Sequence, residues 1–333
     1  MDVSEIGEFG LIKRLTSILG QEAPQDMVVG IGDDAAAWRA GDQYVLATTD
    51  TLVEGVHFLP AVTPWADVGW KALAVNVSDI GAMGGEPMFA LITLALPPET
   101  AVGDIEDLYR GLRECAVRYA VTVAGGDVVS APQVSITVAL IGHAQVSAGQ
   151  PRLLLRSGAR VGDAIAVSGT LGDSAGGLSS MRPGNQVHVA LVAAHLRPQP
   201  PLLLGQEAAR EGIRCAIDVS DGLLQDIGHV CEMSGVGALV KADAVPVSEA
   251  LHGAYPDDAL RLACTGGEDY ELVLVGKRKL IERAAASSGI DVTFIGEIVE
   301  DAERRVRLLD GEGREIDFGT AGWDHMRAAK RGA

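Results

Sequence analysis

The sequence predicts an α/β (α+β) protein built from two domains. Apolar strand-like runs alternate with helical patterns along the 333 residues. A segment rich in glycine and turn-forming residues, 146–163, interrupts this alternation near the middle. The chain is also long enough for two hydrophobic cores of ordinary size. We therefore expect an N-terminal domain at 1–148 and a C-terminal domain at 149–333.

The N-terminal half has the pattern of a mixed sheet covered by helices. We expect helices at 8–19, 65–83 and 101–119, and strands at 44–50, 88–96, 121–127 and 133–144. The strand at 88–96 is apolar almost throughout, so we expect it to be buried, and Pro97 and Pro98 end it.

The second half repeats the alternation as a separate α/β unit. We expect strands at 164–169, 215–220, 270–276 and 291–298, and helices within 171–181 and 221–235. Gly235 is typical of a helix C-terminus. The short runs "NVSDIG" (76–81) and "DVSDGL" (218–223) echo each other, a match short enough to arise by chance.

Composition excludes several classes of partner. Hydrophobic residues make up 47% of the chain, which indicates a globular protein. The 45 acidic and 27 basic residues give a net charge of −18. Nucleic acids and anionic membranes attract basic surfaces, so neither is expected as a partner. Phosphorylated small molecules remain possible ligands if cations accompany them.

Cysteine usage and the N-terminus point to the cytoplasm. Cys115, Cys215, Cys231 and Cys264 are far apart in the sequence, which suggests neither a zinc site nor a disulfide framework. The stretch "MDVSEIGEFG" is acidic and lacks the apolar core of a signal peptide. No apolar run approaches the roughly 20 residues that a membrane span needs. We expect a cytoplasmic enzyme.

Seven aspartates lie at turn signals or near the ends of apolar runs. Each alone could be a turn former or a helix cap. Because ligands of α/β sheets bind where strands end, the whole set predicts a carboxylate-rich cleft. The residues are Asp33, Asp34, Asp50, Asp79, Asp127, Asp218 and Asp221.

An all-oxygen ligand set selects hard cations such as Mg²⁺, Mn²⁺ or Ca²⁺. Mg²⁺ commonly shares its coordination between carboxylates and substrate phosphates. We therefore predict several Mg²⁺ ions that clamp a polyphosphate. Such ions would also make the adjacent like charges in "GIGDDAA" (30–36) tolerable.

Common nucleotide and nucleophile motifs are missing from the sequence. Neither G-x-x-x-x-G-K-[ST] nor G-x-G-x-x-G occurs. The glycine-rich turn at 168–178 could present backbone N–H groups to a phosphate or serve only as a structural turn. No histidine has a recognisable serine or cysteine partner in sequence. His57 stands out because it follows "TTDTLVEG".

An ordered set of motifs resembles the thiamine-monophosphate kinase family, part of the aminoimidazole-ribonucleotide synthetase-like ATP-binding superfamily. The resemblance runs from about residue 7 to "GWDH" at 322–325. Its motifs are "GIGDDAA", "TTDTLVEGVHF", "KALAVNVSDIGAMGGEP", "GGDVVSA", "RSGARVGD", "SGTLGDSAGGL", "AIDVSDGLLQDIGH" and "GGEDYELV".

The resemblance implies an ATP-dependent conversion of thiamine monophosphate to thiamine diphosphate. It also implies a two-domain synthetase-like fold, in which the N-terminal sheet pairs with that of a second subunit in a homodimer. The C-terminal α/β domain would close over the active site. ATP would be the co-substrate and several Mg²⁺ ions would be bound.

Motif positions imply the site residues. Metal ligands would be Asp34, Thr48, Thr49, Asp50, Asp79, Asp127, Asp218 and Asp221. Among these, Asp79, Asp127 and Asp218 would be central to catalysis. ATP would contact Gly126, Asp127, Arg156 and Ser220, and the thiamine end would contact His57, Glu268 and Trp323.

Three other functions compete with this interpretation. Another ATP-using synthetase of the superfamily would act on a purine precursor or on selenide, and the latter is expected to use a cysteine near the N-terminus, whereas the first here is Cys115. A metal-dependent phosphatase would use water as the acceptor. A Ca²⁺-binding module would have no catalytic activity.

Overall fold

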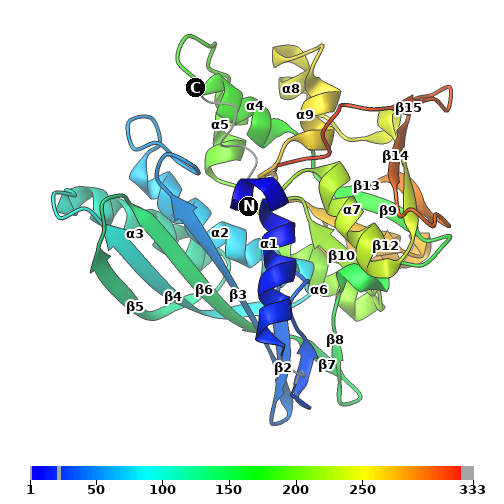
Figure 1. Cartoon of the computed structure of the whole chain (residues 1–333), viewed down its shortest axis with the longest axis horizontal. Coiled ribbons are helices and arrows are strands. Elements are labelled where there is room, and N and C mark those ends of the chain that lie inside the picture. Colours follow the sequence, from blue (N-terminus) through cyan, green and yellow to red (C-terminus); the bar gives the residue numbers. More distant parts are fainter. Residues whose placement is uncertain (1, 21–23, 324–333) are drawn as a thin grey trace.

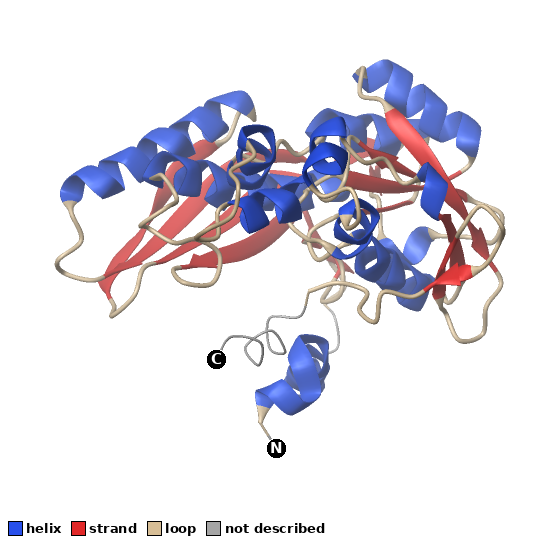
Figure 2. Ribbon diagram, turned by 90° about the horizontal axis from the view of Figure 1, so that it is seen from above, coloured by secondary structure: helices blue, strands red, loops and turns tan. Residues whose placement is uncertain are grey.

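Two β-sheets organise the chain, one in each half (Figure 1). The computed structural model describes residues 2–20 and 24–323. In Figure 2 the two sheets lie next to each other, each with helices packed against it. Within the described ranges, no helix combines the length and apolar character needed to cross a membrane.

The first sheet has six strands in the order β1-β2-β3-β6-β4-β5. All neighbours are antiparallel except β4 and β5, which are parallel and joined through α3. The strands are β1 (Met27–Val29), β2 (Ala36–Ala40), β3 (Gln43–Val53), β4 (Glu86–Leu96), β5 (Thr122–Ser130) and β6 (Ser135–His143).

Helices α2 (Trp65–Ala82) and α3 (Val102–Arg118) cover one face of this sheet (Figure 2). They pack backbone to backbone at two glycines. A Cβ on Gly69 would lie 1.9 Å from the Leu108 carbonyl oxygen, and a Cβ on Gly111 would lie 1.7 Å from that of Ala66. This close contact fixes the position of α2 against α3.

The other face of the first sheet is open. In β4, Ala90, Ile92 and Leu94 are buried, whereas Phe89 and Leu91 are 43% and 44% exposed. The expectation that the strand at 88–96 is buried therefore holds for one face only, because helices cover only one side.

The second sheet has seven strands in the order β10-β12-β9-β13-β11-β14-β15. Only β11 and β14 pair in parallel. The strands are β9 (Ala164–Ser168), β10 (Cys215–Asp218), β11 (Gly237–Lys241), β12 (Leu272–Gly276), β13 (Val292–Val299), β14 (Val306–Leu309) and β15 (Glu315–Ile316).

Both faces of the second sheet are apolar, and helices pack on each. One hydrophobic cluster involves α7 and a second involves α6 and α10. The remaining helices lie around the site or at the chain start. The helices not yet given are α1 (Val3–Leu19), α4 (Asp173–Ser180), α5 (Val189–Leu196), α6 (Leu202–Glu211), α7 (Leu223–Ser234), α8 (Glu249–Ala254), α9 (Ala259–Thr265) and α10 (Arg278–Ser288).

Local expectations agree with these elements at several points. The helix expected at 8–19 begins earlier, at Val3, and is interrupted at Gly7, whose φ is 69°. Gly235 ends α7 in the left-handed conformation, as its position predicts. The segment 146–163 contains a small hairpin, β7 (Gln145–Ser147) with β8 (Gln150–Arg152), followed by a connection into β9.

Candidate active site at the junction of the two domains

Three aspartates from distant parts of the chain form a buried carboxylate cluster. Asp34 lies in the turn before β2, Asp79 on α2, and Asp218 at the end of β10. Their carboxylate oxygens all lie within 4.8 Å of one another. Both domains therefore contribute to what we call the Asp34–Asp79–Asp218 cluster.

Hydroxyl and guanidinium groups satisfy part of this cluster. Thr48 Oγ1 donates to Asp79 Oδ2 at 2.5 Å, and Ser78 Oγ donates to Asp218 Oδ2 at 2.6 Å. Arg156 donates to Asp34 Oδ1 through Nε at 3.1 Å and also through Nη2. Asp34 Oδ2 is buried and has no hydrogen-bond partner among the described residues.

Burial makes ionisation of the cluster costly. It raises the pKa of Asp218 to about 7, with the nearby Asp34 charge adding to the effect. Burial is also the main cause that raises the pKa of Asp79 well above its usual range, and the carboxylates of Asp50, Asp218 and Asp34 raise it further. The pKa of Asp34 is raised by burial as well, although Arg156 opposes the shift. Arg156 thus compensates only part of the negative charge of the three carboxylates.

The two adjacent aspartates have different partners. Both carboxylate oxygens of Asp33 accept from the backbone N–H of Arg156, at 3.3 and 3.2 Å. Burial, and then the charge of Asp34, raise the pKa of Asp33 to about 6. Asp33 thus fixes the backbone of Arg156, whereas Asp34 faces the cluster and binds the side chain of the same arginine.

Of the metal ligands predicted on strand β3, only some have side chains on the same side of the sheet as the cluster. Thr48 contacts Asp79, and Asp50 raises the pKa of the same residue, so both lie on the α2 side. Thr49 lies between them, and because side chains alternate along a strand its side chain is on the open face. It is exposed, as expected there. Within a single chain, this orientation does not support the predicted role of the Thr49 side chain as a metal ligand.

Asp127 also lies outside the cluster. It is on β5, the exposed edge strand, and its carboxylate accepts from the Val128 N–H at 2.9 Å. Strands β6 and β4 separate β5 from β3, which places Asp127 roughly 14 Å from β3. The sequence expectation of one cleft with Asp127 in it is therefore not met by the geometry of a single chain. Gly126 precedes it on the same strand.

Asp221 belongs to a second group of possible ligands with Asp226 and His229. One ligand atom from each lies within 4.8 Å of the others. Asp226 accepts from the backbone N–H groups of Asp221 and Gly222, at 3.2 and 3.0 Å, at the start of α7. Asp221 is therefore not one of the three carboxylates of the first cluster, although the two groups are near enough for Asp218 to raise the pKa of Asp226, which caps α7.

A second charged group surrounds Glu268. Its Oε1 lies 2.7 Å from Lys71 Nζ, and its Oε2 lies 3.6 Å from His195 Nδ1. Burial would raise the pKa of Glu268, but Lys71, His195 and His57 together hold it below its usual value. Burial lowers the pKa of His195 to about 4, so this imidazole is neutral near pH 7. Lys71 supplies the compensating charge.

The backbone around Glu268 is held in an unusual conformation. Glu268 and Tyr270 have φ values of 67° and 53°, in the left-handed region that non-glycine residues seldom adopt. Their N–H groups donate to the carbonyls of Ser220 at 2.7 Å and Val219 at 2.8 Å. Both carbonyls directly follow β10, so the Glu268 loop is fixed to the strand that ends in Asp218.

Trp323 is tied to the site through its backbone. Its N–H donates to the Asp221 carbonyl at 3.0 Å, and its carbonyl accepts from Gln225 Nε2 at 2.6 Å. The residue is 44% exposed, so its indole is not a buried plug. The other two residues of "GWDH", at 324 and 325, lie outside the described ranges.

The glycine-rich turn at 168–178 receives a carboxylate of the chain itself. Asp269 accepts from the backbone N–H groups of Gly172 at 2.6 Å and Ser174 at 3.1 Å, at the start of α4. A Cβ on Gly172 would lie 2.6 Å from the backbone nitrogen of Ala263. Of the two interpretations left open by the sequence, these contacts favour the structural turn.

Sequence reasoning missed Lys71 and Ser78. Both lie in the buried part of α2, whose sequence has the pattern of an ordinary apolar helix with scattered polar residues. The available signal was their spacing, because residues seven apart lie on one side of a helix. A buried lysine seven residues from a serine therefore indicates a polar stripe on that side.

Comparisons with known proteins agree with this architecture. Family models described as the N-terminal and C-terminal domains of AIR synthase related proteins match residues 32–144 and 160–308. Thiamine-monophosphate kinase of Escherichia coli strain K12 is 40% identical over 330 residues, covering 96% of this chain and 98% of that protein. The Aquifex aeolicus strain VF5 kinase is 34% identical, with 98% and 100% coverage.

Solved structures show the same similarity. A structure of AaThiL complexed with AMPPCP and TMP has a TM-score of 0.84 at 34% identity, covering 98% of this chain and 99% of that one. The kinase from Stenotrophomonas maltophilia K279a has a TM-score of 0.74 at 36% identity, with 93% and 98% coverage. Full-length similarity in both sequence and fold leads to one conclusion: the chain belongs to the thiamine-monophosphate kinase family of AIR synthase related proteins.

Proposed function

We propose that this protein transfers the γ-phosphoryl group of ATP to the phosphate of thiamine monophosphate, giving ADP and thiamine diphosphate. The family carries the general activity, because the relatives named above are thiamine-monophosphate kinases and one was solved with AMPPCP and TMP. Within this chain, the observation that carries the proposal is the Asp34–Asp79–Asp218 cluster, in which three carboxylates face a single guanidinium, that of Arg156.

The cluster has the chemistry of a Mg²⁺ site. Its ligands are carboxylate oxygens, the type that Mg²⁺ prefers. Asp34 Oδ2 is buried without a hydrogen-bond partner in the described chain, and burial raises the pKa values of its neighbours. Asp34, Asp79 and Asp218 would hold the metal, with Thr48 and Asp50 beside them. Several Mg²⁺ ions would supply charge neutralisation at the phosphates.

Arg156 would change partners when nucleotide binds. In the ligand-free chain its guanidinium is the positive group that faces Asp34. A divalent cation at Asp34 would leave Arg156 available for an ATP phosphate, the role that its motif position predicts. Ser220 is another predicted ATP contact. Its carbonyl accepts from the Glu268 N–H, and Asp221 follows it in the chain.

Transfer would be direct and in line, without a phosphoenzyme. The acceptor is a phosphate, already ionised near pH 7, so the reaction needs no strong base. The hydroxyls at the cluster, on Thr48 and Ser78, each donate to an aspartate that would hold the metal, so their hydrogen bonds serve the metal ligands. Catalysis would then consist of positioning and electrostatic stabilisation.

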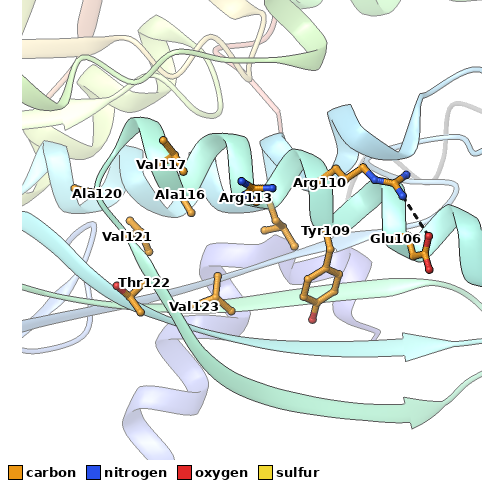
Figure 3. Close-up of a pocket in the computed structure, with 11 residues that line it drawn as sticks. Glu106, Tyr109, Arg110, Arg113, Ala116, Val117, Ala120, Val121, Thr122 and Val123 are labelled. Atoms are coloured by element: carbon orange, nitrogen blue, oxygen red, sulfur yellow. Dashed lines mark hydrogen bonds and ion pairs between the residues drawn. The ribbon is translucent and has the colours of Figure 1, made fainter.

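A groove between α3 and β5 would accommodate the nucleoside of ATP. Figure 3 shows this cavity of about 820 Å³, with Tyr109 of α3 and Val123 of β5 on its walls. A neighbouring cavity of about 550 Å³ is lined by Tyr109 and by Val128. Gly126 and Asp127 lie on β5 between these two valines. Gly126 and Asp127 line neither cavity, and their contact with ATP stays a prediction from the motif.

The acceptor would bind between Glu268, His57 and Trp323. Glu268 is an ionised carboxylate and suits the cationic thiazolium ring. His57 is close enough to lower the pKa of Glu268. The exposed indole of Trp323 could stack on a cation, a contact worth about 0.5–2 kcal/mol.

The open face of the first sheet would pair with a second copy of the chain. Its edge strand β5 is exposed along its whole length, and Phe89 and Leu91 of β4 are more than 40% exposed. Large apolar surface of this kind is typical of interfaces. We therefore propose a homodimer, and a cytoplasmic location in keeping with four unpaired cysteine thiols.

An acceptor screen tests the proposal. Purified protein with ATP and Mg²⁺ should convert thiamine monophosphate to equimolar thiamine diphosphate and ADP, measured by chromatography. Thiamine, aminoimidazole ribonucleotide precursors, selenide and water are the competing acceptors. Steady ATP hydrolysis without an organic product would indicate a phosphatase, and Ca²⁺ binding without nucleotide turnover would indicate a binding module. With a chiral γ-phosphate, direct transfer predicts inversion, whereas retention would require a phosphoenzyme.

A further inference from the structure

Helix α2 contacts both parts of the site with one side. Lys71 and Ser78 are seven residues apart, so they lie on the same side, about 10 Å apart along the axis. Ser78 donates to Asp218 in the Asp34–Asp79–Asp218 cluster, and Lys71 pairs with Glu268. One rigid helix of the N-terminal domain therefore spans the distance from the metal cluster to the acceptor carboxylate.

The two partners of α2 are themselves rigidly connected within the C-terminal domain. Asp218 pairs with Leu272 in the β10–β12 ladder, and the Glu268 loop enters that same β12. The N–H groups of Glu268 and Tyr270 bond to the carbonyls that follow Asp218. A Cβ on Gly267 would lie only 2.4 Å from the Ser220 carbonyl oxygen, so the loop lies tightly against this strand end.

We propose that Lys71 is a positioning residue of the acceptor site, and this inference rests on the proposed function. Its ammonium holds the Glu268 carboxylate at a fixed place relative to Asp218 and Asp79. Glu268 can then meet the cationic ring of the acceptor while the acceptor phosphate points toward the cluster. Lys71 acts through Glu268 and need not touch the substrate.

The burial pattern favours this role over a purely structural one. The side chain of Lys71 is 5% exposed, whereas that of Glu268 is 25% exposed, so the carboxylate remains the part that a ligand can reach. For stability alone, a buried ion pair is often no better than a well-packed apolar pair. His195, whose Nδ1 lies 3.6 Å from the Glu268 carboxylate, is neutral and cannot replace the charge of Lys71.

The first test compares Lys71→Met with Lys71→Arg by separate KM measurements for the two substrates. K71M should raise the KM for thiamine monophosphate about 10- to 100-fold, the loss expected for a charged hydrogen bond. The KM for ATP should stay unchanged, and K71R should recover most of the acceptor binding. In an E268Q background, K71M should have little further effect, because Lys71 acts through that carboxylate.

Arg197→Gln is the matched control. Arg197 forms an ion pair with Asp67 of α2, one helical turn from Lys71, and a second with Glu114 of α3. R197Q should lower the melting temperature and leave both KM values unchanged. If K71M behaves like R197Q, or if K71M and E268Q are additive, the inference is wrong. Lys71→Gln replaces K71M if that variant does not fold. A wild-type protein without kinase activity would instead overturn the proposed function.

Discussion

The carboxylate pKa values shift in opposite directions in the two charged groups of the site. In the Asp34–Asp79–Asp218 cluster, burial and neighbouring carboxylates raise the pKa values, and Asp34 Oδ2 lacks a partner in the described chain. At Glu268, whose side chain is partly exposed, one buried lysine and two histidines lower the pKa of the carboxylate. The difference shows where the balancing positive charge must come from: the chain itself supplies it at Glu268, whereas the cluster needs cations from outside the chain in addition to Arg156.

Neutralising Asp79 tests this comparison most strongly. Asp79→Asn keeps the shape of the side chain and removes the charge that would hold the metal. We expect kcat to fall about 10²- to 10³-fold, the usual cost of one transition-state electrostatic contact. The same holds for Asp218→Asn. Steady-state assays at saturating Mg²⁺ measure the loss, and near wild-type turnover would remove either residue from the metal site.

The stability of the metal-free variants should differ in sign between the two groups. Asp218→Asn removes a charge that is unfavourable in the folded state, so its melting temperature should rise by a few degrees at pH 8. Glu268→Gln leaves Lys71 buried without its counter-charge, so its melting temperature should fall. Thermal melts in a chelator check both, and shifts of the same sign would show that the comparison is mistaken.

The stabilisation by Mg²⁺ should increase with pH. The folded-state pKa of Asp218 is about 7, above its ordinary value of 3.8. Stability from the bound proton is therefore complete below about pH 4 and is lost as the pH rises through about 7. Because Mg²⁺ competes with this proton, its effect on the melting temperature should be larger at pH 8 than at pH 5.5. A constant shift across this range would contradict a carboxylate site.

The smallest expected effect concerns Trp323. Trp323→Ala should raise the KM for thiamine monophosphate roughly 2- to 30-fold, as the energy of a cation–π contact implies, and leave that for ATP unchanged. The melting temperature should change little, because the residue is 44% exposed and the backbone of residue 323 makes its contacts to Asp221 and Gln225. A large loss of melting temperature with an unaltered acceptor KM would assign Trp323 to structure.

The sequence predicts the cluster better than it predicts the Glu268 group. Asp34 and Asp218 follow recognisable turns or strands, and strand ends gather at one edge of a sheet, so their meeting could be expected. Lys71 lies inside a buried helix, and its partner is about 200 residues away, so no local pattern joins them. Asp127 is the opposite case. Its sequence motif strongly predicts a site residue, but its strand, β5, is an edge strand that β6 and β4 separate from β3.

The four residues from Glu268 to Glu271 show why this loop should resist changes in length. The side chains of Glu268, Asp269 and Glu271 reach Lys71, the start of α4 and Ser168, respectively. The left-handed backbone at Glu268 and Tyr270 makes this divergence possible within so short a segment. Deleting or inserting a single residue here would move all three carboxylates away from their partners. Among related chains, residues 268–271 should therefore vary by substitution more readily than by insertion or deletion. The exposed turn at 182–187 should tolerate changes in length.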